Sequence, residues 1–339
     1  MDYFMHLCYD AILLTRVFVA PLVVRDGGGG NFDGVDCATV LRDSAWRRCV
    51  AALATQARSY VALTKPRILL LVIFSGLPVL AMATDGWPGT AFACTTLAGI
   101  ALAAGAANTL NCYLERDLDA RMERTKGRPL PAHRLEPRAA LVFGLTLAGV
   151  SSALLYAAAG LVPVALAVAS ILFYVFVYTL WLKPRSPLAA VVGGAAGAAA
   201  PLIADAAVNG SVGVAGWTLF AIIFLWQPPH VWAIALFRKS DFERGGIPVL
   251  PVVIGDEGTR WRMLWYTLVL VPVTLAPVAA GLLGALYLSV ALVLDAWFVY
   301  HAVRVLRERS DAAARGMFHV SLIFLFGLFA TMLVDRVLL

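Results

Sequence analysis

Hydrophobic residues in this chain occur in nine long stretches, and each stretch is bounded by charged or turn-forming residues. A helix needs about 20 consecutive apolar residues to cross the hydrocarbon core of a bilayer. Small residues recur inside the stretches, as in VVGGAAGAAAPLIA at 191–204, and they let helices approach closely in lipid. The pattern predicts an all-α integral membrane protein, a bundle of nine transmembrane helices. The stretches lie near 67–84, 88–110, 139–158, 162–182, 187–207, 214–236, 263–284, 286–303 and 317–335.

The composition excludes other classes of protein. Of the 339 residues, 61% are apolar and 14% are charged, and the mean hydropathy is +0.81. Soluble domains have about 45–50% apolar and about 25% charged residues, so a water-soluble enzyme and a disordered chain are both excluded. The five cysteines form no CxxC pair, which excludes a disulfide scaffold and a thiolate metal site.

The positively charged residues are distributed unevenly among the connections between the stretches. The formal net charge is +6. Seven Lys and Arg lie in the second connection, two in the fourth, five in the sixth and four in the eighth, whereas the odd-numbered connections have none. Because such residues remain on the cytoplasmic side, we expect the N-terminus and the even-numbered connections in the cytoplasm, with the chain in the cell inner (plasma) membrane. The basic excess then orients the chain in the lipid bilayer, and we expect no nucleic-acid partner.

Residues 1–58 differ from the rest. They contain the flexible sequence DGGGGNFDG at 26–34 and an apolar stretch at 12–24 that is short and carries Arg16. The first residues, MDYFMHL, lack the basic residues that begin a signal peptide. We therefore expect residues 1–58 to be a flexible or mis-annotated extension, and residues 59–339 to be the transmembrane domain.

The first cluster of ionisable residues is NCYLERDLDARMERTKGRPLP, residues 111–131, at the expected cytoplasmic end of the second stretch. Asn111, Glu115 and Asp119 recur every four residues, which places them on one face of a helix, with Asp117 roughly opposite. Amide and carboxylate oxygens suit Mg²⁺, which often bridges protein carboxylates to substrate phosphates. A solvated loop with incidental acids is the alternative. Cations suited to gripping phosphate oxygens follow at Arg121, Arg124, Lys126 and Arg128.

Two further connections on the same side carry similar groups. The sixth connection, LFRKSDFERGGIPVLPVVIGDEGTR at 236–260, supplies oxygens from Asp241 and Glu243. A polyphosphorylated ligand bridged by metal would require acidic and basic groups from more than one connection. The cations of these two connections include Arg238, Lys239 and Arg244 in the sixth and Lys183 and Arg185 in the fourth.

The sixth stretch contains FLWQPPHVWAIALF at 224–237, in which Gln227 and His230 flank two prolines. Pro228 and Pro229 predict a break in this helix, and such breaks usually line a cavity. His230 would then bind or orient a substrate, or act as an acid or base. The alternative is a structural histidine bonded to a neighbouring helix.

The motif at 111–131 resembles the first aspartate-rich motif of the UbiA-type intramembrane prenyltransferases. More narrowly, the segments YVALTKPRI (60–68), WQPPH (226–230) and FRKSDFERGGIPVLPVV (237–253) are similar to the protoheme IX farnesyltransferases, a family also called heme O synthases. The resemblance covers about residues 60–339. It implies nine transmembrane helices around a central cavity, with both acidic motifs at its cytoplasmic mouth.

This resemblance also implies an activity and a set of site residues. Members of the family transfer the farnesyl group of farnesyl diphosphate to a vinyl group of heme b, with addition of water. The reaction needs Mg²⁺. The resemblance also implies heme A synthase or oxidase assembly proteins as partners. Glu115 stands where Asp is commoner, and Ser240 replaces an acid that often precedes Asp241. Matching by position implies metal ligands at Asn111, Glu115, Asp119 and Asp241, and diphosphate contacts at Lys183, Arg238 and Lys239.

Two alternative functions remain from the sequence. Another UbiA-type prenyltransferase acting on an aromatic or quinone precursor would share the first motif. A multi-pass transporter is the alternative from a different class, because transporters use broken helices. The position of the ionisable residues at the helix ends favours the enzyme.

Overall fold

A computed structural model describes residues 37–83 and 87–338, and side chains between residues 48 and 336 of that part. Residues 1–36, with the expected flexible sequence at 26–34 and the apolar stretch at 12–24, lie outside the described residues. The chain divides into two units, residues 1–52 and 53–339. Helix α2, Cys37–Thr64, runs through the expected boundary at residue 58, so residues 37–58 are helical.

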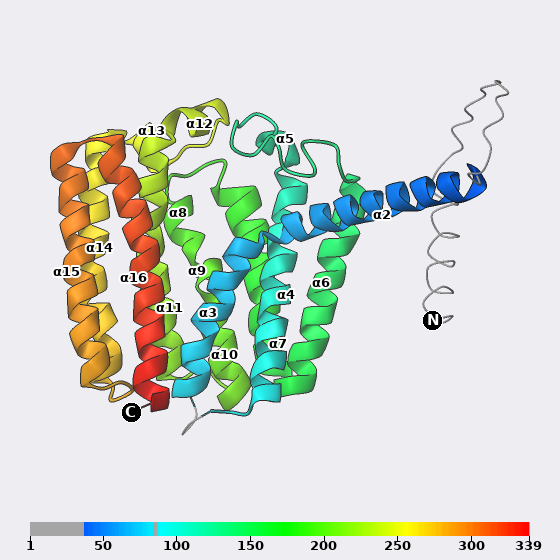
Figure 1. The fold of residues 1–339 in the computed structure, drawn as a ribbon. Helices are drawn as coiled ribbons and strands as arrows, with labels where there is room; N and C mark the ends of the chain where they lie inside the picture. The colour runs from blue at the N-terminus through cyan, green and yellow to red at the C-terminus, as the bar shows by residue number, and fades with distance from the viewer. Residues whose placement is uncertain (1–36, 84–86, 339) are drawn as a thin grey trace. The chain divides into compact units, whose positions relative to one another are not determined.

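Every regular element in the described part of the second unit is helical (Figure 1). After α2, the elements are α3 (Pro66–Met82), α4 (Thr90–Leu114), α5 (Arg116–Asp119), α6 (Pro137–Ala159), α7 (Leu161–Leu172), the π-helix η1 (Phe173–Leu182), α8 (Ala189–Val192), α9 (Gly194–Gly197), α10 (Ala199–Asn209), α11 (Val214–Phe237), α12 (Lys239–Arg244), α13 (Leu250–Val253), α14 (Gly255–Ala279), α15 (Ala285–Glu308) and α16 (Asp311–Leu338).

The nine predicted spans are found as helices in the described residues. Eight are long and apolar enough to cross a membrane, and the bent pair Val50–Thr64 and Pro66–Met82 makes a ninth if it is one span. The boundaries differ most at α14, which begins at Gly255 rather than near residue 263. The apolar pattern missed the first two turns because they carry charged residues, with Asp256 and Glu257 near the helix N-terminus, where acidic residues are favourable.

The predicted break at Pro228 and Pro229 is wrong. Helix α11 continues through both prolines as an α-helix from Val214 to Phe237. A transmembrane helix tolerates internal proline because neighbouring helices and local adjustments satisfy the freed backbone groups. A helix break at this position therefore does not form the cavity.

The irregular helices lie instead in the fifth span and at the end of the fourth. The fifth span is divided into α8, α9 and α10 at Gly193 and Ala198, and η1 ends the fourth with π-helical hydrogen bonding. A side chain at Gly193 would begin 2.2 Å from the ring of Tyr178. One at Gly197 would begin 2.3 Å from Nε2 of Gln227, so both glycines allow a close approach. Neither irregularity requires proline.

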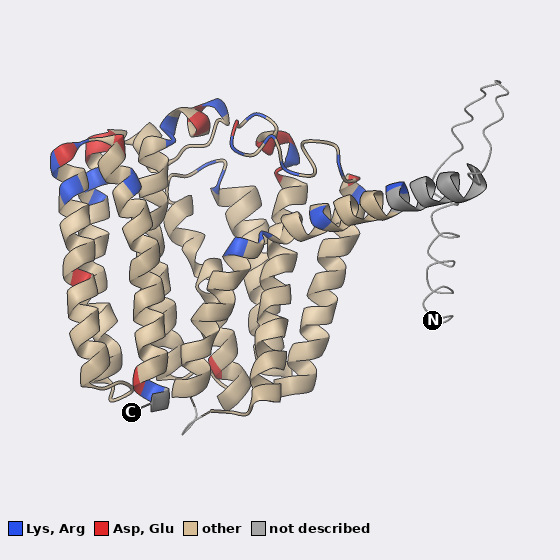
Figure 2. Cartoon of the chain, viewed as in Figure 1, with Lys and Arg blue, Asp and Glu red and all other residues tan. Residues whose placement is uncertain are grey.

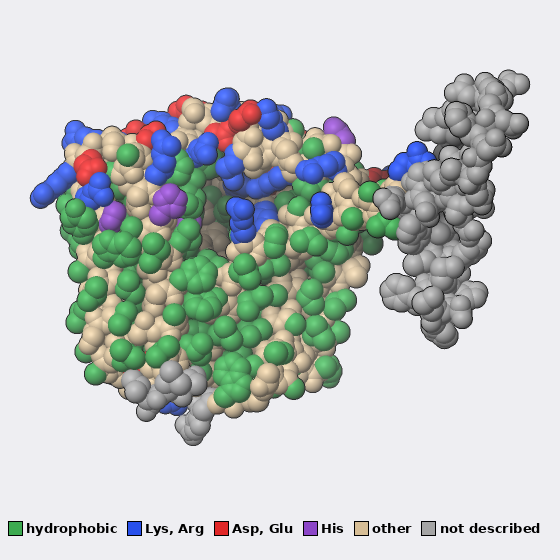
Figure 3. All heavy atoms as spheres, viewed as in Figure 1, with side chains coloured by type: hydrophobic (Ala, Val, Ile, Leu, Met, Phe, Trp, Pro, Cys, Tyr) green, Lys and Arg blue, Asp and Glu red, His purple; other side chains and the backbone are tan. Residues whose placement is uncertain are grey.

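The helices pack around one large apolar core, in which α4 lies against α6, α11 against α14 and α16, and α15 against α16. Large apolar side chains also cover the outer face of the second unit, for example Leu161 at 70% and Val293 at 68% exposure. Figure 3 shows these hydrophobic side chains spread over the body of the molecule on one face. An exposed apolar surface of this extent is typical of a protein in contact with lipid.

Charged residues concentrate at one end of the bundle (Figure 2). We call it the basic end; it carries the connections α4–α6, η1–α8, α11–α14 and α15–α16. At the opposite end, Asp205 accepts hydrogen bonds from the backbone nitrogens of Gly213 and Gly216, both at 2.8 Å, and so caps the start of α11. These contacts give Asp205 a structural role.

Candidate active site

The first acidic motif forms a buried row at the basic end. Asn111 lies in the last turn of α4, Glu115 is the capping residue between α4 and α5, and Asp119 ends α5. Their exposures are 1%, 5% and 1%, whereas the side chain of Asp117 is 82% exposed. The helical spacing predicted that Asp117 lies on the face opposite the row.

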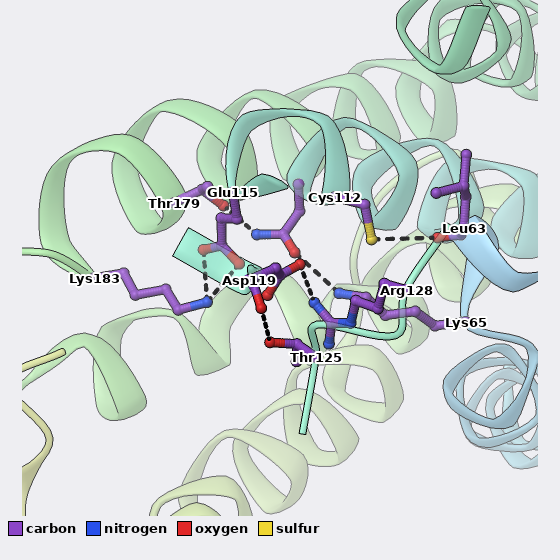
Figure 4. A network of polar contacts seen from close by, with 10 residues as sticks. Leu63, Lys65, Cys112, Glu115, Asp119, Thr125, Arg128, Thr179 and Lys183 are labelled. Carbon is purple, nitrogen blue, oxygen red and sulfur yellow. Dashed lines mark hydrogen bonds and ion pairs between the residues drawn. The ribbon is translucent and has the colours of Figure 1, made fainter. Parts of the chain in front are cut away.

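Each buried carboxylate of the row is paired with a cation from elsewhere in the chain (Figure 4). Lys183, directly after η1, donates from Nζ to both carboxylate oxygens of Glu115 at 2.6 Å. Arg128 donates from Nη1 to Oδ2 of Asp119, also at 2.6 Å. Burial acts to lower the pKa of Lys183, but Tyr178 and Glu115 outweigh it, so the pKa of this amine is raised. The lysine therefore remains a cation at neutral pH.

Asn111 connects the row to two residues that the sequence analysis did not select. Nζ of Lys65 donates to Oδ1 of Asn111 at 3.0 Å, and Nδ2 of Asn111 donates to Oγ1 of Thr179 at 3.0 Å. Lys65 has a left-handed backbone conformation, φ 55° and ψ 66°, at the bend between α2 and α3. Non-glycine residues in this region are uncommon and concentrate at functional sites. The sequence TKPR around Lys65 is the feature that could have identified this lysine as part of the site.

The second acidic motif meets the first through the loop that follows α5. The backbone nitrogen of Glu123 donates to Oδ1 of Asp241 at 2.9 Å, and Arg244 contacts the same oxygen at 3.3 Å. Arg124 interacts electrostatically with both Asp119 and Asp241. The two motifs therefore lie together at the basic end, as expected from the sequence.

Several predicted diphosphate contacts lie outside this network. Lys126 pairs with Glu123 at 2.7 Å on the exposed surface, and Lys239 pairs with Asp256 at 3.0 Å. Arg185 donates to the carbonyl oxygens of Leu180 and Trp181, so it caps the end of η1. Arg238 is exposed, with Cζ 5.9 Å from the centre of the Phe237 ring. Spacing along the sequence could not separate these cations from Lys183 and Arg128, because the loop path decides which ones turn inward.

An apolar cavity of about 310 Å³ lies within the bundle beside this network. Its walls are mainly small and aliphatic residues of α3, α4, α8, α9 and α10, together with Tyr174 and Tyr178 of η1. The ring of Tyr178 is 5.9 Å from Nζ of Lys183, so the cavity ends beside the charged residues. Figure 3 shows a hollow on one face of the molecule, with Lys and Arg along its upper edge.

His230 lies outside the charged network and does not line this cavity. Its Nδ1 is 2.7 Å from Oγ of Ser321, and its ring stacks on Trp226 with centres 4.5 Å apart. Of the two polar residues flanking the prolines, Gln227 is the one in the cavity wall. The sequence identified the polar positions in this helix but could not assign their faces.

The capacity to hold a metal depends on the first motif. Among residues 37–83 and 87–338, no three His, Cys, Asp or Glu side chains gather as a ready metal cluster. Oδ1 of Asp119, however, is buried and has no hydrogen-bond partner. A buried, unpaired carboxylate oxygen is costly, and a hard cation would satisfy it. Oδ1 of Asp119 is thus the oxygen of this row that is open to a cation such as Mg²⁺, whereas the oxygens of Glu115 and Asn111 accept hydrogen bonds from Lys183 and Lys65.

The sequence profile of the UbiA prenyltransferase family matches residues 69–328. The chain belongs to this family. It is 47% identical over 282 residues to the protoheme IX farnesyltransferase of Bradyrhizobium diazoefficiens, a match covering 82% of this chain and 90% of the relative. It is 43% identical over 314 residues to the protoheme IX farnesyltransferase of Acidiphilium cryptum, covering 88% of this chain and 98% of the relative.

Solved UbiA-family structures share the fold of this chain. A digeranylgeranylglyceryl phosphate synthase superposes with a TM-score of 0.71 at 16% identity, over 84% of this chain and 99% of the other. A UbiA homolog from Archaeoglobus fulgidus, bound to DMAPP and Mg²⁺, has a TM-score of 0.54 at 15% identity, over 81% of this chain and 99% of the other. The predicted fold class is confirmed.

Proposed function

We propose that this prenyltransferase transfers the farnesyl group of farnesyl diphosphate to a vinyl group of heme b. Water adds in the same overall reaction, and the products are heme O and diphosphate. The observation that carries the proposal is the likeness to protoheme IX farnesyltransferases, which extends at 43–47% identity over more than four fifths of the chain. The buried charged network beside an apolar cavity is the geometry that a prenyl diphosphate requires.

The cations of the network would bind the diphosphate head. Lys65, Lys183 and Arg128 all contact residues of the Asn111–Asp119 row, so three positive charges converge on one small region. Negative charge develops on the diphosphate as its bond to the farnesyl carbon breaks. Fixed cations in a site with little water stabilise that charge strongly. No protein nucleophile is needed.

Mg²⁺ would be held by Asn111, Glu115 and Asp119, with Asp241 on the neighbouring motif as the remaining predicted ligand. Bound there, the metal would supply further positive charge to the leaving diphosphate. The unpaired Oδ1 of Asp119 supports this assignment. The Archaeoglobus homolog, which binds DMAPP together with Mg²⁺, supports it for the fold.

The cavity would hold the farnesyl chain. Its walls are predominantly apolar, and it meets the charged network at Tyr178. An apolar wall excludes stray water from the reactive carbon, so the diphosphate does not leave by simple hydrolysis. The basic end would face the cytoplasm in a bacterial inner membrane, because Lys and Arg remain on that side.

The test is the mass of the product after purified protein in lipid nanodiscs is incubated with farnesyl diphosphate, heme b and Mg²⁺. We expect heme b to gain the mass of one farnesyl group and one hydroxyl group, because the other proton of the added water leaves with the diphosphate. Asp119→Asn should abolish this product, and chelation of Mg²⁺ should do the same. Asp117→Asn is the matched control: it lies two residues away with an 82% exposed side chain, and it should retain activity.

Transfer of farnesyl to an aromatic acceptor instead of heme b would replace the proposed substrate and keep the reaction class. Uptake of farnesyl diphosphate without diphosphate release would contradict the enzyme assignment. Full activity of folded Asp119→Asn would contradict the metal assignment.

A further inference from the structure

A second group of interacting side chains lies where α11 contacts α16, separate from the charged network. His230 of α11 stacks on Trp226 at 4.5 Å between ring centres and lies 4.9 Å from the ring of Phe318 on α16. Nε1 of Trp226 donates to the carbonyl oxygen of Ser321 at 2.8 Å. The imidazole is therefore held between two aromatic rings at a fixed position.

The hydrogen bonds of Ser321 determine which nitrogen of His230 carries the proton. Oγ of Ser321 lies 2.6 Å from the carbonyl oxygen of Phe318, which can only accept, so the hydroxyl donates its single hydrogen there. Oγ must then accept from Nδ1 of His230, at 2.7 Å. A neutral imidazole is favoured within a membrane span because a charge there is costly. Nε2 is left with a free lone pair and has no hydrogen-bond partner among the described residues.

An imidazole with Nδ1–H donated to an oxygen and Nε2 free is the arrangement found in histidine ligands of metals. Three residues along an α-helix turn by about 300°, so His230 lies about 60° around α11 from Gln227. Gln227 and Val231 are in the wall of the cavity. A ligand bound at His230 would therefore lie beside the cavity, on the neighbouring flank of the same helix.

The surroundings of His230 suit a flat, amphipathic anion. Phe237 lies two turns further along α11 and contacts the ring of Phe318 at 6.3 Å. Cζ of Arg315 lies 5.5 Å from the centre of the Phe237 ring. Arg315 pairs with the carboxylate of Asp311 at 3.6 Å, with both side chains mostly exposed, and such a pair is weak. The face thus offers aromatic rings and, toward the basic end, a cation available to a carboxylate.

We propose that this face of α11 and α16 binds the heme b substrate, with Nε2 of His230 as a ligand of the iron, the ring of Phe318 beside the macrocycle, and Arg315 toward a propionate. The inference rests on the proposed function, and it assigns the two substrates to different binding sites. The prenyl chain occupies the cavity, and the porphyrin approaches it from the α16 side of α11.

The test compares iron-containing and iron-free porphyrin on the full-length protein in nanodiscs, without farnesyl diphosphate. Hemin should bind with the Soret band and electron paramagnetic resonance spectrum of an imidazole-ligated ferric heme. His230→Ala should lose that signature and weaken hemin binding at least about tenfold, which corresponds to about 1.4 kcal/mol. Binding of iron-free protoporphyrin IX should change little, and added imidazole should restore the signature.

Two further variants separate ligation from a structural role. His319→Ala removes an exposed histidine one residue from Phe318 and should leave the spectrum unchanged. Arg315→Gln should weaken binding of hemin but not of its dimethyl ester, whose propionates carry no charge. Thermal unfolding of each variant checks that the fold is intact.

An unchanged hemin spectrum and affinity in folded His230→Ala would overturn the proposal, whether or not the wild-type protein makes heme O. If His230→Ala weakened the binding of hemin and of protoporphyrin IX equally, the proposal would also be overturned, because lost packing rather than lost iron ligation would explain the weaker binding. Hemin ligation by His230 in a protein that forms no heme O would contradict the proposed function and leave the binding site in place.

Discussion

At the scale of single residues, the site is a set of buried charges that neutralise one another. Glu115 and Asp119 are at most 5% exposed, and each is bonded to a cation at 2.6 Å. Removing one partner of a buried pair leaves an uncompensated charge, which costs far more than the pair contributes. These contacts therefore constrain which substitutions the site tolerates.

Lys183→Met tests this directly. We expect it to lower the free energy of unfolding by about 3 kcal/mol, because Glu115 loses its buried partner. Turnover should fall at least about a hundredfold, because a cation facing the diphosphate is also lost. Lys126→Met is the matched control: its pair with Glu123 is exposed, so stability should change by less than about 1 kcal/mol and turnover should be retained. Thermal unfolding and product formation measure the two effects.

Equal loss of activity in both variants would show that Lys126 contacts the diphosphate, as the sequence alone predicted. The helical period was sufficient to predict the Asn111–Glu115–Asp119 row, because backbone hydrogen bonds between residues four apart continue from α4 into α5. The helical period could not predict the cations that contact these three residues. Lys65, Lys183 and Arg128 reach the row from three separate connections, and no local pattern specifies where those connections pass.

At the scale of elements, glycine rather than proline shapes the cavity wall. The sequence predicted a break at the proline pair, whereas the interrupted helix is the glycine- and alanine-rich span containing α8, α9 and α10. Composition indicated close helix contacts in that span, but the contacts themselves depend on the facing side chains. Tyr178 of η1 and Gln227 of α11 occupy the space that a side chain at Gly193 or Gly197 would need.

Gly193→Ala should distort this wall. The added carbon would lie 2.2 Å from the Tyr178 ring and 2.6 Å from the carbonyl oxygen of Ala189, so the ring and the backbone must both move. Overpacking of this kind costs about 1–3 kcal/mol, and we expect a raised KM for farnesyl diphosphate because Tyr178 lines the cavity. Gly149→Ala in α6 is the control: it meets nothing within 4 Å and should stabilise the helix by about 0.5–1 kcal/mol. An unchanged KM in folded Gly193→Ala would show that the ring position does not limit substrate binding.

At the scale of the whole chain, hydropathy and charge together predict the spans and the end of the bundle at which each described connection lies. The apolar stretches predicted the spans because lipid leaves a backbone few alternatives to helix. They misplaced the start of α14, which extends beyond the apolar core with charged residues in its first turns. The gathering of Lys and Arg at one end (Figure 2) agrees with the alternation of charge between connections.

That alternation leads to a testable orientation in the membrane. Ala132 is exposed in the α4–α6 connection at the basic end, and Ser211 is exposed in the α10–α11 connection at the other end. We expect Ala132→Cys, in a chain whose native cysteines are replaced, to resist a membrane-impermeant thiol reagent in intact cells and to react after permeabilisation. Ser211→Cys should react in intact cells. The reverse pattern would place the charged network outside the cytoplasm and would contradict the orientation predicted from the positive charges.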